Sequence, residues 1–160
     1  MDRDDFCGNI RICERAMYSL ALSVLRNEED ASDAISESVY RAYKNIDTLK
    51  NDSSFKPWIL RIVHNTAVEM IRKNENITPV DELPETASWK EEEDTVSRLT
   101  LREAVESLKS PYDTVVILFY YENLSVSKIA QITGTNIAAV KQQLSRARKM
   151  LREILKEDFS

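Results

Sequence analysis

Residues 124–151 have the sequence LSVSKIAQITGTNIAAVKQQLSRARKML, in which two helical patterns lie on either side of one glycine. Ser125 can cap the first helix, because a serine side chain accepts a hydrogen bond from the backbone of the first turn. Gly134 permits the tight turn of residues 133–136, and Ala130 is small enough to let two helices approach closely. The apolar positions of the second helix recur at steps of three and four, at Ile137, Val140, Leu144, Ala147 and Leu151. This stretch predicts a helix-turn-helix.

The second of these helices is strongly basic. Six basic residues and no acidic residue lie between Ser125 and Arg152, although the whole chain has a net charge of -5. Residues near the start of such a helix reach base edges in the major groove, and charges further along lie over the phosphates. We therefore expect DNA to contact the outward positions of this helix and its turn, which are Asn136, Lys141, Gln142, Ser145, Arg146, Arg148 and Lys149.

The rest of the chain also has the pattern of helices. It contains only 2 glycines and 4 prolines, too few for the tight turns of a sheet. The first predicted helix has an apolar face of Phe6, Ile10, Cys13, Met17, Leu20 and Val24. The second follows Glu28-Glu29-Asp30 and buries Ala31, Ile35, Val39, Ala42 and Ile46. Pro57 lies in the first turn of the third, whose inner face is Ile59, Ile62, Val63, Thr66 and Met70.

The helical periodicity disappears over residues 74–94, where Pro79, Pro84 and many acidic residues occur. It returns with Leu101, Ala104, Val105 and Leu108. Ser110-Pro111-Tyr112-Asp113 then resembles a helix start with a serine cap and a capping acid. Residues 115–121 have strand propensity, but a lone strand would have no partner, so we expect a helix there. The sequence predicts an all-α protein of two small helical domains, 1–73 and 95–160, joined by a flexible acidic linker at 74–94.

The sequence offers no site for catalysis. His64 is the single histidine, and Cys7 and Cys13 have neither redox nor zinc-site spacing. Neither glycine belongs to a phosphate-binding loop. We therefore expect no enzyme activity, cofactor, metal or small-molecule substrate. No apolar run approaches the roughly 20 residues that span a bilayer, and no leader pattern is found, so we expect a cytoplasmic protein with reduced thiols that is not inserted in a membrane.

Three stretches, taken together, resemble a known family. They are residues 30–43 (DASDAISESVYRAY), residues 55–65 (FKPWILRIVHN) followed by Glu69, Arg72 and Lys73, and the helix-turn-helix of residues 124–148. Their order and spacing are similar to those of the extracytoplasmic-function (ECF) sigma factors of bacterial RNA polymerase. The resemblance implies a transcription initiation factor with three partners: core RNA polymerase, promoter DNA and an anti-sigma factor. It also implies that the C-terminal helix-turn-helix recognises the minus-thirty-five element.

The resemblance assigns two further sets of residues. The helix that docks on polymerase would use Asp30, Asp33, Ala34, Glu37, Ser38 and Arg41. The minus-ten element would be contacted by Lys50, Asn51, Ser53, Phe55, Lys56, Trp58, Arg61 and Asn65. Such aromatic, polar and cationic types suit the holding of unstacked bases. For Trp58, a place in the core under the third helix is an equal alternative. For Asn65, base contact is favoured, because an amide is costly to bury without partners.

Two other functions are compatible with parts of this pattern. A free-standing helix-turn-helix regulator would bind operator DNA alone and would need a dimer interface or a ligand pocket. A structural helical adaptor would leave the uninterrupted basic stretch of residues 125–152 without a purpose.

Overall fold

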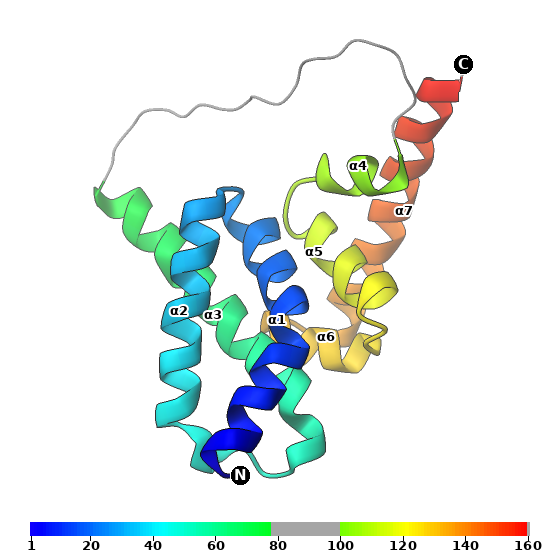
Figure 1. Cartoon of the computed structure of the whole chain (residues 1–160). Helices are drawn as coiled ribbons and strands as arrows, with labels where there is room; N and C mark the ends of the chain where they lie inside the picture. The colour runs from blue at the N-terminus through cyan, green and yellow to red at the C-terminus, as the bar shows by residue number, and fades with distance from the viewer. Residues whose placement is uncertain (78–99, 160) are drawn as a thin grey trace.

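The computed structural model describes residues 1–77 and 100–159, and within these ranges every regular element is helical (Figure 1). The all-α prediction is confirmed. The N-terminal half contains α1 (Arg3–Leu25), α2 (Glu28–Lys44), the 3-10 turns η1 (Ile46–Thr48) and η2 (Asp52–Ser54), and α3 (Phe55–Ile77). The C-terminal half contains α4 (Leu101–Glu106), α5 (Tyr112–Val116), the π-helical turn η3 (Ile117–Tyr121), α6 (Val126–Thr133) and α7 (Ile137–Phe159).

The three N-terminal helices pack on one another, and α1 and α3 do so along the expected stripes. Met17 and Leu20 of α1, with Ile59 of α3, have no exposed surface. The buried face of α2 differs from the prediction, since it consists of the small residues Ala31, Ala34, Ser38 and Ala42. Ile35 and Val39 are only partly buried, and Ile46 lies in η1 beyond the end of the helix. Small side chains let α2 lie close to its neighbours, which apolar periodicity alone did not reveal.

Side-chain caps determine where α1 and α2 begin. The carboxylate of Asp2 accepts a hydrogen bond from the Asp5 backbone N–H (2.8 Å), and Asn27 accepts one from the Asp30 N–H (2.9 Å). Acidic residues follow both caps, where they meet the positive end of the helix dipole. Residues close together in the sequence therefore determine where each of these two helices begins.

The end of α3 and the start of α5 both differ from the predictions. The helix α3 continues to Ile77, four residues into the predicted linker 74–94, and most of that linker lies outside the described residues. Ser110 does not cap α5 through the backbone. Its hydroxyl donates instead to the Ser23 carbonyl (2.9 Å) and to Asp113 (3.2 Å), because α1 lies against this segment. The prediction of helix over residues 115–121 is confirmed by α5 and η3.

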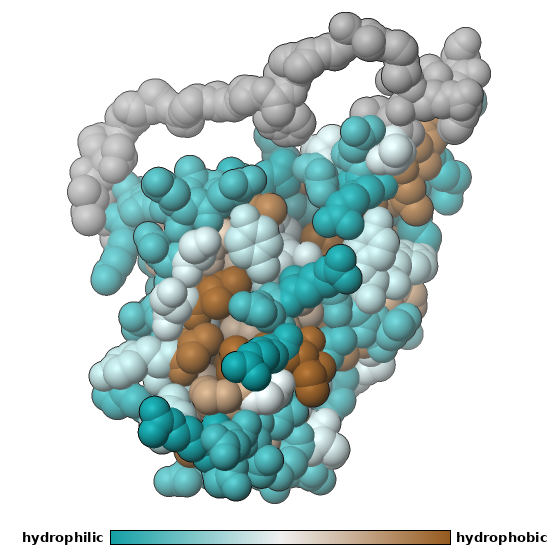
Figure 2. All heavy atoms as spheres, in the orientation of Figure 1, coloured by the Kyte–Doolittle hydropathy of each residue, from teal (hydrophilic) through white to brown (hydrophobic). Residues whose placement is uncertain are grey.

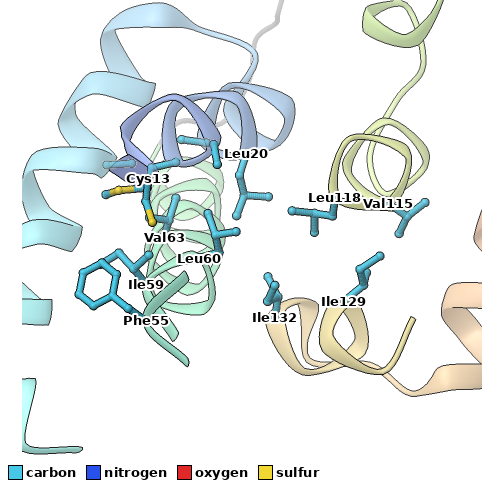
Figure 3. Packing of buried hydrophobic residues seen from close by; sticks show 14 of the residues in the cluster. Cys13, Leu20, Phe55, Ile59, Leu60, Val63, Val115, Leu118, Ile129 and Ile132 are labelled. Carbon is cyan, nitrogen blue, oxygen red and sulfur yellow. The ribbon is translucent and has the colours of Figure 1, made fainter. Parts of the chain in front are cut away.

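The two halves share one hydrophobic core. Leu60 of α3 is fully buried together with Leu118 of η3 and Ile132 of α6. Figure 3 shows the side chains of Leu20 and Leu60 directed toward Leu118 and Ile132 across the boundary. A second, smaller cluster lies within the C-terminal half and includes Ala104, Val105, Leu108, Val116, Ile117, Ala147 and Leu151. Helices far apart in the sequence thus depend on each other for burial of their apolar faces.

A polar seam, made of Ser23, Arg26, Ser110, Asp113 and Thr114, runs beside this shared core. Arg26 Nη1 donates to Asp113 Oδ2 at 2.7 Å, and the hydroxyls of Ser23 and Thr114 are 2.8 Å apart. Asp113 is 1% exposed and Thr114 is 2% exposed. Buried polar groups need hydrogen-bond partners, and these contacts supply them at an interface that is otherwise apolar.

Candidate nucleic-acid interface

The helix-turn-helix has the predicted geometry. Ser125 accepts a hydrogen bond from the Lys128 N–H (3.1 Å), and Gly134 ends α6 with a φ of 72°, in the left-handed region that favours glycine. Asn136 caps α7 by accepting from the Ala139 N–H at 2.8 Å. Its side-chain oxygen therefore has a structural role at the start of α7.

The inward face of α7 leaves a basic face outside. Val140, Leu144, Ala147 and Leu151 are at most 9% exposed and pack on the rest of the C-terminal half. The remaining predicted positions are all exposed: Lys141, Gln142, Ser145, Arg146, Arg148 and Lys149. Because the buried and exposed residues alternate with the helical period, this face is available to a polyanion such as DNA.

The predicted minus-ten residues divide into an exposed and a buried group. Lys50, Asn51, Ser53, Arg61 and Asn65 are exposed. Asn51 Oδ1 caps η2 by accepting from the Ser53 N–H at 3.0 Å, and it also accepts from the Ser53 hydroxyl at 2.9 Å. These two side chains therefore hold the loop in shape as well as facing solvent.

Phe55 and Lys56 are placed differently from the expectation, and Trp58 fits one of its two predicted alternatives. Phe55 is 3% exposed, and its ring lies edge-on to that of Phe6 at 5.9 Å, so it is a core residue in this structure rather than a surface for bases. Trp58 is half-buried against Phe55 and donates its indole N–H to the Thr48 hydroxyl (3.2 Å), which agrees with the alternative of a core anchor. Lys56 Nζ lies 2.9 Å from Glu122 Oε1, so a residue of the C-terminal half neutralises it.

The expected docking helix α2 presents an acidic face to solvent. Asp33 and Glu37 are exposed one turn apart, and Arg41 joins Glu37 (2.9 Å) to Glu69 of α3 (3.0 Å). These ion pairs raise the pKa of Arg41 above its usual value. Asp33, Glu37, Arg41 and Glu69 line a shallow cleft of about 320 Å³ between the two helices. The ion pair between Arg41 and Glu69 could not be predicted from the sequence, because the two residues are 28 positions apart.

Three expected docking residues are less accessible. Ala34 and Ser38 have no exposed surface, and the Ser38 hydroxyl donates to the Ala34 carbonyl at 2.6 Å. Asp30 is partly buried in the first turn. Positions 34 and 38 lie on the buried face of α2, so they pack in the protein and cannot contact a partner in this conformation.

Other titratable groups are buried without forming a site. Burial raises the pKa of the Cys13 thiol and lowers the pKa of His64. The described side chains include no cluster of three or more histidine, cysteine, aspartate or glutamate residues suited to a metal ion. Within the described ranges, none of the helices combines the length and apolar character that crossing a membrane requires.

The exposed surface of α2 carries aromatic as well as acidic side chains. Figure 2 shows one face that is mostly hydrophilic, with hydrophobic side chains gathered between α1 and α2. On α2 itself, Tyr40 and Tyr43 are 59% and 51% exposed, and Lys44 Nζ lies 5.2 Å from the centre of the Tyr40 ring. The helix α2 thus combines exposed acidic residues with two exposed aromatic rings. The sequence motif predicted the acidic residues and did not predict the exposed rings.

Comparison with known proteins identifies both halves. Residues 10–77 match the family model of sigma-70 region 2, and residues 98–151 match that of sigma-70 region 4. RNA polymerase sigma factor SigV of Bacillus subtilis is 36% identical over 144 residues, which cover 89% of this chain and 87% of SigV. ECF RNA polymerase sigma factor SigW of the same organism is 29% identical over 173 residues, covering 98% of this chain and 91% of SigW.

Solved structures show the same fold. Sigma factor RpoE, in a complex with the anti-sigma factor NepR from Bartonella quintana, superposes with a TM-score of 0.72 at 22% identity, covering 96% of this chain and 98% of RpoE. CnrH, in a complex with the cytosolic domain of CnrY, gives 0.67 at 19% identity, covering 98% and 91%. The helix-turn-helix, the basic α7 and the acidic α2 agree with these matches. The two family models and the relatives show that the chain belongs to the sigma-70 family, as an ECF RNA polymerase sigma factor.

Proposed function

We propose that this sigma factor divides its work between domains 1–73 and 95–160, on either side of a linker at 74–94. The N-terminal domain docks on core RNA polymerase and holds the minus-ten element, and the C-terminal domain recognises the minus-thirty-five element. The observation that carries the proposal is the exposed basic face of α7, which follows a glycine turn and lies opposite a buried apolar stripe.

On α7, the proposed roles follow from position. Lys141, Gln142, Ser145 and Arg146 lie near the start of the exposed face, where side chains reach base edges. Arginine and lysine donate to guanine acceptors, and glutamine pairs with adenine. Arg148 and Lys149 lie further along and contact phosphates.

In the N-terminal domain, the exposed residues carry the proposed contacts. The minus-ten surface consists of Lys50, Asn51, Ser53, Arg61 and Asn65, with Lys56 joining only when Glu122 releases it. The polymerase contact consists of Asp33, Glu37 and Arg41, with Tyr40 beside them. Buried Phe55, Ala34 and Ser38 support these surfaces from within.

The regulatory partner is proposed from the relatives. RpoE and CnrH, which share the fold, were solved in complexes with NepR and with CnrY. We propose that this sigma factor works in the cytoplasm, where polymerase is found, and that an anti-sigma factor holds it there until a signal releases it.

Binding of promoter fragments with and without core RNA polymerase tests the function. We expect the sigma factor to bind them tightly only as holoenzyme; equal binding without polymerase would indicate a free-standing regulator.

Within the holoenzyme, Arg146→Ala should cost about 1 to 3 kcal/mol of binding free energy and relax selectivity at one upstream base pair. Lys149→Ala is the matched control, because it should weaken all sequences alike and reduce the salt dependence by about one unit. A uniform loss for Arg146→Ala would show that it contacts a phosphate.

A further inference from the structure

Tyr120 lies on the π-helical turn η3 and contacts the recognition helix, 28 residues further along the chain. Arg148 Nη1 of α7 donates a hydrogen bond to the Tyr120 hydroxyl oxygen at 2.8 Å. Both side chains are exposed, and the Tyr120 residue retains 47% of its accessible surface. A tyrosine outside the helix-turn-helix therefore stands at the edge of its DNA-facing surface.

The tyrosine is held in place from behind. Its ring packs edge-to-face on Phe119, with ring centres 4.9 Å apart and planes at 85°. Phe119 in turn packs against the shared core, and Leu118 beside it is fully buried. Single π-helical turns such as η3 occur frequently at functional sites. The ring contact with Phe119 and the hydrogen bond from Arg148 thus place the exposed hydroxyl beside α7.

The pair offers an unsatisfied set of donors. The Tyr120 oxygen accepts from Arg148, which leaves the hydroxyl proton free to donate. The guanidinium has five N–H groups, and among the described residues only Tyr120 accepts a hydrogen bond from one of them. A hydroxyl donor beside a permanent cation matches the oxygens of a phosphate group, to which charge-assisted hydrogen bonds are strong.

The position on α7 also fits a phosphate. Arg148 lies four residues after Leu144 and three residues before Leu151, so its side chain lies beside the buried stripe of α7, at one flank of the exposed face. Arg146 lies nearer the middle of the exposed face. When a recognition helix enters the major groove, the middle of its exposed face meets the bases and its flanks meet the sugar-phosphate backbone.

We propose that Tyr120 is a DNA-binding residue, which donates its hydroxyl hydrogen to a backbone phosphate of the upstream promoter element and holds Arg148 against the same phosphate. This inference rests on the proposed function of α7. It extends the DNA-binding surface from the helix-turn-helix to η3, and it gives Arg148 a fixed rather than a mobile phosphate contact.

The test uses holoenzyme and a duplex promoter fragment that wild-type holoenzyme transcribes, with dissociation constants measured at several salt concentrations. The variants are Tyr120→Phe, Arg148→Ala and the double variant; Tyr121→Phe is the matched control, since Tyr121 is 46% exposed and has no hydrogen bond within the described residues. Tyr120→Phe should weaken binding about three- to tenfold, the range for one hydrogen bond, without changing the salt dependence. Arg148→Ala should also reduce the salt dependence by about one unit. In the Arg148→Ala background, the loss of the hydroxyl should have less than about a twofold effect.

A second measurement separates binding from a structural role. Methylphosphonate linkages, which remove one phosphate charge at a time, are placed along the upstream half of the duplex. At one linkage the substitution should weaken the wild-type and Tyr121→Phe holoenzymes and leave the Tyr120→Phe/Arg148→Ala variant unaffected. Unchanged affinity of Tyr120→Phe, or a loss that is fully additive with Arg148→Ala, overturns the inference while Arg148 remains a phosphate contact. If no duplex fragment is found that wild-type holoenzyme binds and transcribes, the proposed function is overturned as well.

Discussion

Arg26 ends α1 and also joins the two halves of the molecule. It adopts a left-handed conformation (φ of 60°), and its guanidinium then reaches across to the C-terminal half. Nη1 donates to Asp113 and to the Leu108 carbonyl, both at 2.7 Å, and Nη2 donates to the Glu106 carbonyl at 3.2 Å. A single side chain thus satisfies a buried carboxylate and two backbone carbonyls of α4 and the segment that follows it.

Removing the Arg26 side chain should destabilise the protein. Arg26→Ala leaves the carboxylate of Asp113, which is 1% exposed, without its cation, and an unpaired buried charge is costly. Because the Arg26 side chain is itself 38% exposed, we expect a loss of about 2 kcal/mol in the free energy of unfolding, measured by urea denaturation. Arg102→Ala is the control: it breaks an exposed pair with Glu106 and should cost under about 1 kcal/mol. Equal losses for the two variants would refute the role of burial.

Asp113 should make stability depend on pH. Burial raises its pKa from 3.8 to about 6, although Arg26 acts in the opposite direction. The native pKa lies above the unfolded value, so the contribution is fully present below about pH 3.8 and is lost as the pH rises through 6. Between pH 4.5 and 7, the wild type should lose about 2 kcal/mol of unfolding free energy relative to Asp113→Asn, which has no proton to release. Parallel pH profiles of the two proteins would contradict this assignment.

At the scale of elements, local signals accounted for most of the helices. Caps at Asp2, Asn27 and Ser125, and a glycine after α6, are short-range features that a linear sequence displays. Ser110 shows where such reasoning stops, since it has the right spacing for a cap but bonds to α1 instead. A capping pattern has its usual meaning only while no other element competes for the side chain.

The two glycines of the chain should respond oppositely to alanine. Gly134 has a φ of 72°, so Gly134→Ala should lose about 1 kcal/mol through backbone strain, although a Cβ there meets no atom within 4 Å. Gly8 lies inside α1, and its added Cβ also has open space. Gly8→Ala should therefore stabilise the protein by about 0.5 to 1 kcal/mol, because alanine has the higher helix propensity. Thermal unfolding compares both; a shift of the same sign for both variants would contradict this.

For the whole molecule, the shared core predicts that the two halves unfold together. Leu118 is fully buried in the cluster that also holds Leu60 and Met17. Leu118→Ala should cost about 3 kcal/mol and should lower hydrogen-exchange protection in both α3 and α6. Leu151→Ala removes the same atoms from the second cluster, which lies only in the C-terminal half, and should affect α3 less. Full protection of α3 in the Leu118→Ala variant would show that the halves fold independently.

By itself, the sequence determined the all-α class, the order of the main helices, the helix-turn-helix and its exposed basic face. These follow from caps and from a 3.6-residue period, which are properties of neighbouring residues. Only the tertiary structure decided that Phe55 is buried, that Glu122 neutralises Lys56 and that Tyr120 contacts Arg148. Each of these depends on which faces of distant helices meet. That choice is made by burial of apolar surface over the whole molecule, and no local spacing in the chain records it.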